Sequence, residues 1–242
     1  MAMANRLRPC MRTWICVGIS EVAVPLAPSA AAVRWGVKPA VWLLALAPAA
    51  WLAWAIYRAL QGDGAPLGAD PAETIVHLSG ETAIRALLAT LLVGALRDLF
   101  AMRWIVRIRR LLGLFAFFWG VLHLGSYLWL ELDLGLGRLA EDFRDRPYIL
   151  AGGVGLLSML PLAITSTNGW RRRLGRRWNS LHKLVWVSAL AVCVHLLWQA
   201  RSDLAEAVLY ALLFGTLAIQ RLWTRRPHAP PSRSEQVPVE VP

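Results

Sequence analysis

Apolar residues recur along the chain in runs of about 20, long enough to cross a hydrocarbon layer roughly 30 Å thick as helices. The second run is the least regular, because Arg85 and Arg97 stand near its ends, and their long stems are expected to carry the charges to the membrane surface. The pattern predicts an all-α fold, a polytopic bundle of about six transmembrane helices. The expected spans are residues 39–59, 82–101, 111–131, 148–166, 180–199 and 204–222.

Composition favours a membrane protein over a soluble one, since 57% of the 242 residues are hydrophobic and only 17% are charged. The transmembrane domain is expected to cover residues 38–223. Residues 1–37 are expected to be a poorly structured N-terminal extension. The proline-rich residues 224–242 are expected to form a disordered cytoplasmic tail.

The net charge of +11 comes largely from arginines in short loops beside the apolar runs. This pattern is typical of loops that orient a protein in a membrane, and not of a nucleic-acid-binding surface. The loops before the third and fifth spans are basic, whereas those before the second and fourth are acidic or mixed. Because cytoplasmic loops carry the excess of Lys and Arg, both termini are expected in the cytoplasm. The expected location is a bacterial inner membrane, with lipid around the bundle.

Two histidines are expected at one depth on different helices. At 1.5 Å per residue, His123 and His195 each lie about 20 Å from the cytoplasmic ends of their spans. A haem iron with two axial imidazoles needs one histidine from each side, which this pair supplies. His182 is expected near the cytoplasmic face. His77, in an acidic outer loop, and His228, in the tail, are expected to be solvated.

Other roles for these histidines remain open at this point. Transmembrane histidines also pack or form hydrogen bonds between helices. A proton relay usually recruits intramembrane carboxylates, and none lies in the interior of the third or fifth span. Zinc is disfavoured, because no cysteine or carboxylate completes a tetrahedral set at that level.

A second, inner level is expected to hold Arg109 and His182. Arg109 precedes His123 by 14 residues, which places the two within about 40° on an ideal helix. The arginines of residues 171–177 are expected to set topology. Alternatively, some of them bind a haem propionate, a quinone head group or a flavin phosphate, with Arg172, Arg176 and Arg177 as the candidates. Tryptophans near span ends are expected to be interfacial anchors: Trp129, Trp178, Trp186 and Trp198.

Several stretches resemble one family of membrane haem proteins. They are GADP (68–71), RRLLGLFAFFWGVLHLGSYLWLEL (109–132), RPYILAGG (146–153), LPLAITST (160–167) and LGRRWNSLHKLVW (174–186). Together they resemble the haem-binding membrane subunit of the periplasmic methionine sulfoxide reductase system, the MsrQ or YedZ family. That family lies within the wider ferric-reductase and NADPH-oxidase transmembrane group. The resemblance covers about residues 38–223.

The resemblance implies an inner-membrane electron carrier with b-type haem, one or two copies, and with FMN associated. His123, His182 and His195 are the implied axial ligands. Arg109 stands where the wider group has a fourth histidine, which favours one bis-histidine haem over two. Electrons are expected from the quinone pool or a cytosolic flavin reductase. The expected acceptor is a periplasmic molybdopterin methionine sulfoxide reductase, so that substrate chemistry takes place on the partner.

Two other functions stay open. One is a stand-alone transmembrane ferric reductase, which would reduce its substrate directly at the outer face. The other is a transporter whose membrane histidines carry protons or metal ions.

Overall fold

The computed structural model describes residues 28–100, 103–200 and 204–224, and within these ranges the chain is helical with no strand. The predicted all-α fold is confirmed. Short elements connect the long helices: α1 (Ala30–Ala32), η1 (Val33–Val37), η2 (Ala65–Leu67), η3 (Arg103–Ile105), η4 (Tyr127–Glu131), α5 (Leu136–Asp145), α7 (Asn168–Leu174) and α8 (Arg176–Leu181). The long helices are α2 (Lys38–Leu60), α3 (Pro71–Phe100), α4 (Val106–Ser126), α6 (Tyr148–Ile164), α9 (Leu184–Gln199) and α10 (Leu204–Thr224).

Each of the six predicted spans falls on one long helix. By length and composition, four helical stretches of the described chain can cross a membrane, and α5 with α6 adds a fifth if this pair, bent by 112°, is one broken span. The four are Ala30–Leu60, Val106–Glu131, Arg176–Gln199 and Leu204–Thr224. The polytopic bundle is thus supported, while the count of six spans and the side of each terminus stay predictions.

Two helix starts differ from the sequence expectation. Helical structure begins at Ala30 and continues into α2, so the last residues of the expected N-terminal extension are helical. The helix α3 begins at Pro71, where the backbone N–H of Glu73 donates to the Asp70 side chain. A carboxylate that caps the first turn and a proline in its first position are both typical of a helix start. His77 therefore lies on α3 and not in a loop.

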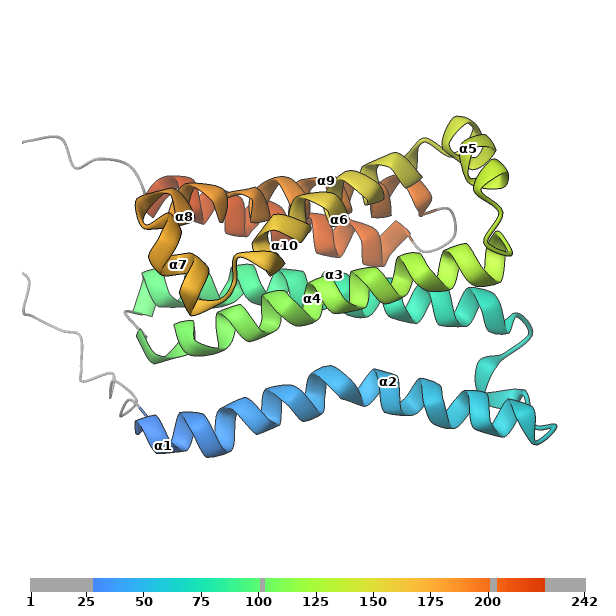
Figure 1. Cartoon of the computed structure of the whole chain (residues 1–242), viewed down its shortest axis with the longest axis horizontal. Coiled ribbons are helices and arrows are strands. Elements are labelled where there is room, and N and C mark those ends of the chain that lie inside the picture. The colour runs from blue at the N-terminus through green and yellow to red at the C-terminus, as the bar shows by residue number, and fades with distance from the viewer. Residues whose placement is uncertain (1–27, 101–102, 201–203, 225–242) are drawn as a thin grey trace, which may run out of the picture.

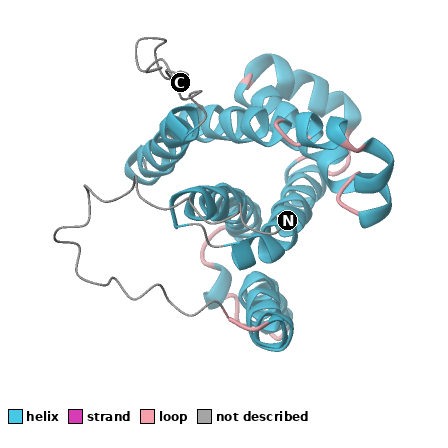
Figure 2. Cartoon of the chain, turned by 90° about the vertical axis from the view of Figure 1, so that its left-hand side faces the viewer, coloured by secondary structure: helices cyan, strands magenta, loops and turns pink. Residues whose placement is uncertain are grey.

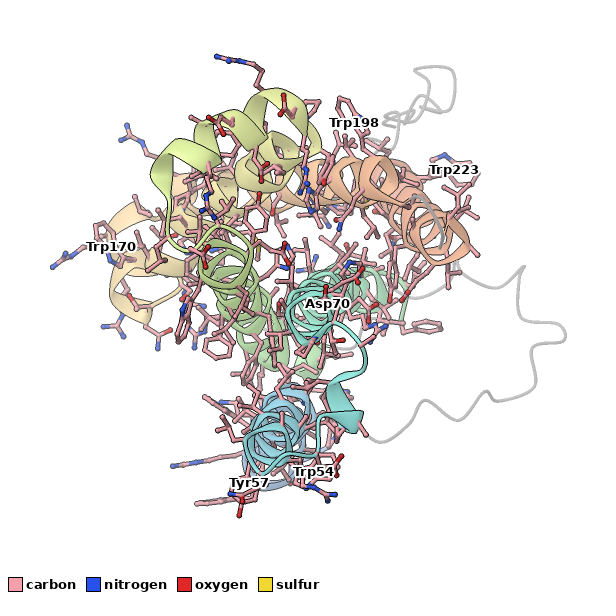
Figure 3. All side chains as sticks on the ribbon, turned by 90° about the vertical axis from the view of Figure 1, so that its right-hand side faces the viewer. Trp54, Tyr57, Asp70, Trp170, Trp198 and Trp223 are labelled. Atoms are coloured by element: carbon pink, nitrogen blue, oxygen red, sulfur yellow. The ribbon has the colours of Figure 1, made fainter. Side chains whose placement is uncertain are left out.

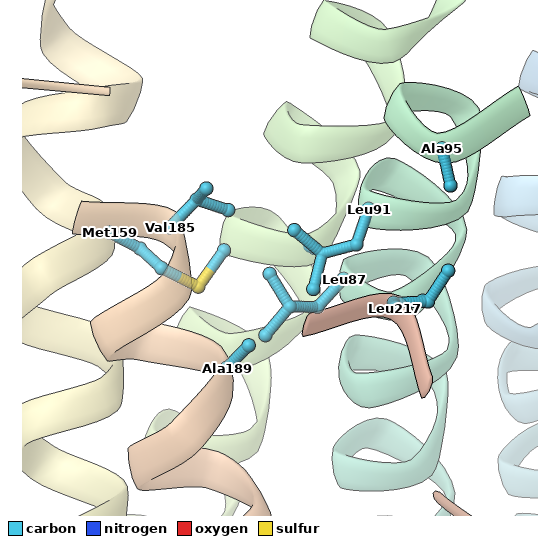
Figure 4. Close-up of a cluster of buried hydrophobic side chains, with 8 residues drawn as sticks. Leu87, Leu91, Ala95, Met159, Val185, Ala189 and Leu217 are labelled. Carbon is cyan, nitrogen blue, oxygen red and sulfur yellow. The ribbon is translucent and has the colours of Figure 1, made fainter. Parts of the chain in front are cut away.

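The helices form two antiparallel pairs that share a core. Figures 1 and 2 show α3 beside α4 at the centre, α6 beside α9, and α10 between α9 and α3. The core lies where these pairs meet (Figure 4), and it contains buried apolar side chains from five helices. They are Leu87, Leu91, Ala95, Ala116, Met159, Val185, Ala189 and Leu217.

The helix α2 packs against the outside of the α3–α4 pair (Figure 2). The indole N–H of the fully buried Trp119 on α4 donates to the carbonyl oxygen of Ala45 over 3.0 Å. Trp42 meets Phe115 edge to face, with the ring centroids 4.9 Å apart. The opposite side of α2 carries exposed aromatic side chains, among them Trp54, which points away from the bundle in Figure 3. An apolar face of this kind suits contact with lipid tails.

Charge separates the two ends of the bundle. At one end, which we call the acidic end, α2 finishes, α3 begins and α5 lies across the helices (Figure 1). At the other, the basic end, α7 and α8 carry the arginines of residues 171–177. The sequence expectation that basic and acidic loops alternate between the two sides therefore agrees with the fold.

Candidate functional site

The structure brings His123 of α4 and His195 of α9 together inside the bundle. Their ring centroids lie 6.3 Å apart, and the ring planes are inclined by 77°. Both side chains are half-buried. The two residues come from different helix pairs, so the contact depends on how α3–α4 packs against α6–α9.

Each of these imidazoles is oriented by a backbone carbonyl. His123 Nδ1 lies 2.9 Å from the carbonyl oxygen of Val76, and His195 Nδ1 lies 2.7 Å from that of Tyr148. Since a carbonyl only accepts, each Nδ1 carries the proton and donates it. The lone pair then lies on Nε2 of each ring. Metal-binding histidines commonly have this arrangement, in which the non-ligating nitrogen donates to a carbonyl.

Glycines make room for the two rings. A Cβ built on Gly80 of α3 would lie 3.0 Å from Nδ1 and Cε1 of His123. A Cβ built on Gly152 of α6 would lie 2.9 Å from Nδ1 of His195. Both helices therefore approach the imidazoles more closely than an alanine would allow. The sequence does not single out Gly80, Val76 and Tyr148, because only the packing of helices shows which residues face a ring.

The pair fits a metal held between two imidazoles. Metal–imidazole bonds are about 2 Å long, and two such bonds plus the half-widths of two rings need about 6 Å between the centroids. The measured 6.3 Å agrees with this requirement. With each Nδ1 bound to a carbonyl, the Nε2 atoms of His123 and His195 would be the ones to hold a haem iron. The residues present therefore fit the group that the sequence predicted.

Arg109 lies in the first turn of α4, and His182 lies between α8 and α9. That the two form one inner site stays a prediction. A Cβ on Gly94 of α3 would lie 3.6 Å from the Arg109 guanidinium carbon, so α3 offers a glycine to α4 at this level too. His182 Nδ1 lies 3.1 Å from the carbonyl oxygen of Trp178, and the two rings stack with centroids 3.7 Å apart.

Two tryptophans expected as interfacial anchors have other contacts. Besides stacking on His182, Trp178 donates its indole N–H to the carbonyl oxygen of Thr165. Trp186 packs against the core and against Phe214. By contrast, Trp129 and Trp198 are exposed, as an interfacial anchor requires.

The structure does not bring the loop arginines to either histidine level through any contact in its described part. Arg172 lies on α7, whereas Arg176 and Arg177 lie on α8, and all three are exposed. Arg110, at the start of α4, joins this helix to the start of α7 by donating to the carbonyl oxygen of Ser166 and to the side chain of Asn168. The topogenic role and the anion-binding role of these arginines both stay predictions.

Arg85 joins α3 to α10. It stands about 21 Å along α3 from Pro71, near the middle of the helix. That its charge lies at a membrane surface stays a prediction. Arg85 donates to Glu81 over 2.9 Å, to Glu206 of α10 over 3.0 Å, and to the hydroxyl of Tyr210 over 2.7 Å. These partners tie the exposed Arg85 of α3 to the start of α10.

Comparison with known proteins agrees with this architecture. The family model for the ferric reductase like transmembrane component matches residues 79–193. The protein-methionine-sulfoxide reductase heme-binding subunit MsrQ of Xanthomonas campestris pv. campestris is 43% identical over 188 residues, 78% of this chain and 86% of the relative. The subunit of the same name from Brucella anthropi is 40% identical over 193 residues, 80% of this chain and 86% of the relative.

The apolar helices and the family-model match together indicate a multi-pass helical membrane protein of the ferric-reductase-like class. Within that class, the chain belongs to the MsrQ family.

Proposed function

We propose that this chain is an inner-membrane electron-transfer subunit that holds haem b between His123 and His195. The observation that carries the proposal is the imidazole pair, with centroids 6.3 Å apart and each Nδ1 committed to a backbone carbonyl. The names of the similar MsrQ subunits, which include heme binding, support it. When bound, the haem supplies an iron that takes up and gives back one electron at a time.

The chain itself supplies orientation and a low dielectric. The carbonyls of Val76 and Tyr148 fix the tautomer of each ring, so that Nε2 is the ligating nitrogen. Gly80 and Gly152 let the backbone press against the rings and limit their rotation. Tyr148 lies against His195, with ring centroids 5.7 Å apart, between the imidazole and the acidic end. Rigid ligands of this kind suit electron transfer, because little has to move when the charge of the iron changes.

We propose that electrons travel from the basic end to the acidic end of the bundle. The donor is the quinone pool or a cytosolic flavin reductase, with FMN as an associated cofactor. The acceptor is a periplasmic molybdopterin-containing methionine sulfoxide reductase, so the subunit supports the repair of oxidised periplasmic proteins. The methionine sulfoxide reductase named in the similar subunits supports this partner.

His182 and Arg109 form the proposed inner site. Arg109 offers a cation inside the bundle, while His182 presents Nε2 because its Nδ1 is held by the Trp178 carbonyl. Arg172, Arg176 and Arg177 are the proposed contacts for a propionate, quinone or flavin phosphate at the nearby surface. This level is proposed to hold a second haem or the entering electron donor.

An optical spectrum of the purified protein tests the haem proposal. The dithionite-reduced protein is expected to show the sharpened Soret, α and β bands of a six-coordinate b-type haem. Folded, purified protein that shows no Soret absorption would refute the haem proposal. That result would favour a transporter, in which the histidines carry protons or metal ions.

A stand-alone ferric reductase is the second candidate, and the family-model match over residues 79–193 favours it. Dithionite-reduced protein, freed of excess reductant, would be mixed with a ferric chelate or with the molybdopterin partner. Rapid reoxidation of the haem by the partner and slow reoxidation by the chelate are expected. The reverse order would support the ferric reductase.

A further inference from the structure

The short helix α5 has one apolar side. Leu139, Ala140 and Phe143 point within about 100° of one another on an ideal helix, and none of them is buried. We call these three residues the α5 stripe. The opposite side of the helix is charged, with Arg138, Glu141 and Asp145. A helix with this division of sides suits a boundary between an apolar medium and water.

The direction of α5 is fixed at both of its ends. Before it, Asp133 and Leu134 have φ angles of 47° and 58°, and the N–H of Leu134 donates to the carbonyl oxygen of Leu128 over 2.8 Å. Arg138 donates to Asp133 across this tight turn over 2.9 Å. After α5 the chain bends by 112° into α6. Helix α5 therefore lies across the bundle at its acidic end (Figure 1).

Asp142 joins α5 to the bundle. Its carboxylate accepts a hydrogen bond from the Tyr127 hydroxyl, and its other oxygen lies 3.9 Å from Nε of Arg146. Tyr127 stands one turn beyond His123, and Arg146 stands two residues before Tyr148, the first residue of α6. The attachment of α5 is thus close in the chain to His123 and to the carbonyl that orients the other histidine.

The α5 stripe points away from this attachment. Asp142 and Phe143 are successive residues of one helix, so their side chains diverge by about 100°. Phe143 is 37% exposed, and Ala140 is exposed as well. A helix of 10 residues is shorter than the roughly 12 to 15 residues that isolated helices need in water, so α5 gains stability from a surface that covers its apolar side.

The surface around α5 has the character of a membrane boundary. Trp129, in η4, and Trp198, near the end of α9, are both exposed, and tryptophans are enriched where lipid meets water. Figure 3 looks onto the acidic end and shows Trp198 at the rim of the bundle. Leu134, just before α5, and Leu150, in the first turn of α6, are exposed apolar side chains. The α5 stripe therefore continues the apolar outer surface of α4 and α6.

We propose that α5 is an interfacial helix that binds the membrane surface at the acidic end, with the α5 stripe among lipid acyl chains and the charged side in water. Helices of this kind bury their apolar side about 5–10 Å into the boundary between head groups and acyl chains. The charged side carries side chains of both signs, so the binding comes from the α5 stripe and does not require anionic lipid. In this assignment α5 is a surface helix and not the first part of a broken span with α6.

Fluorescence quenching in vesicles of phosphatidylcholine and phosphatidylglycerol tests the proposal. In the full chain with its 3 cysteines changed to alanine, Phe143→Cys places an NBD label on the α5 stripe. Glu141→Cys places the label on the charged side, about 200° around the helix. Nitroxide-bearing lipid should quench the label at position 143 at least about twofold more than the label at position 141, and iodide in the water should do the reverse.

Two further positions serve as references. Leu139→Cys lies on the α5 stripe one turn before Phe143, and it should repeat the result if the lipid contact belongs to the whole stripe. Leu157→Cys replaces a side chain that is 68% exposed in the middle of α6, and it gives the quenching of a label that faces acyl chains.

Three outcomes would overturn the proposal. Equal quenching of the labels at positions 141 and 143 by nitroxide-bearing lipid would mean that α5 enters the membrane with α6. Quenching of both labels by iodide alone would mean that α5 lies in water. Protection of the label at position 143 from both quenchers would mean that the α5 stripe packs against protein. Since none of these results involves haem, each would leave the proposed electron-transfer function standing.

Discussion

Gly152 lies directly against the imidazole of His195: a Cβ at this glycine would be 2.9 Å from Nδ1 and 3.1 Å from Cε1. The close approach is part of the site, because the same Nδ1 donates to the carbonyl oxygen of Tyr148, the residue that begins α6. Helix α6 thus orients His195 twice, by a hydrogen bond at its first residue and by contact one turn later.

Gly152→Ala is therefore expected to displace His195 and weaken haem binding. Loss of orienting groups around a metal ligand typically costs 10- to 100-fold in affinity, and we expect at least about tenfold here. Haem content per protein, measured by a pyridine haemochrome assay, checks this. Gly153→Ala is the control, since no atom lies within 4 Å of its Cβ and the helix is the same. Equal haem content in the two variants would show that the close approach has no role.

Trp119→Phe is expected to loosen α2 from the bundle. The change removes the indole N–H that donates to Ala45, and it leaves space around a side chain that is fully buried. We expect a loss of at least about 1 kcal/mol in the free energy of unfolding. Thermal unfolding in detergent measures it. Trp129→Phe, at a side chain 70% exposed, should leave the unfolding temperature unchanged; equal shifts would refute the role of the Trp119 bond.

Asp98→Asn is expected to destabilise the basic end of the bundle. Asp98 accepts from Arg97 over 2.8 Å and from Arg221 of α10 over 2.7 Å, and its side chain is only 18% exposed. Without its charge, these arginines and Arg109 repel one another.

Asp98 is partly buried, so the loss expected in the unfolding free energy of Asp98→Asn is about 2 kcal/mol, between the values for exposed and for buried ion pairs. Asp133→Asn breaks an exposed pair with Arg138 and should cost less than about 1 kcal/mol. Chemical denaturation of both variants in detergent gives the comparison. A smaller loss for Asp98→Asn than for Asp133→Asn would contradict the account.

Much of the architecture could be predicted from the sequence. Apolar runs of bilayer length gave the long helices, because length and hydropathy are local properties. The common depth of His123 and His195 followed from the helical rise and the loop charges, and the rings do meet. Arg109 and His123 also lie on one face of α4, since both face glycines of α3. Arg109 lies near Gly94, and His123 lies near Gly80.

The features that the sequence does not predict depend on contacts between helices. The contacts of Arg85 could not be predicted, because its partners Glu206 and Tyr210 lie on α10, more than a hundred residues further along the chain. The charged first turns of α3 interrupt the apolar run, which predicts a loop at His77 where the structure has a helix. The carbonyls of Val76 and Tyr148 carry no sequence signal, since every residue has a carbonyl.

The most direct test of the account is the haem-to-protein ratio of His123→Ala and His195→Ala. Both variants should lose the haem held by this pair, because neither imidazole alone completes a six-coordinate site. His77→Ala, which removes an exposed imidazole on α3, serves as the control and should keep the wild-type ratio. Wild-type haem content with unchanged reduced spectra in both single variants would contradict the central claim that His123 and His195 hold one haem between α4 and α9.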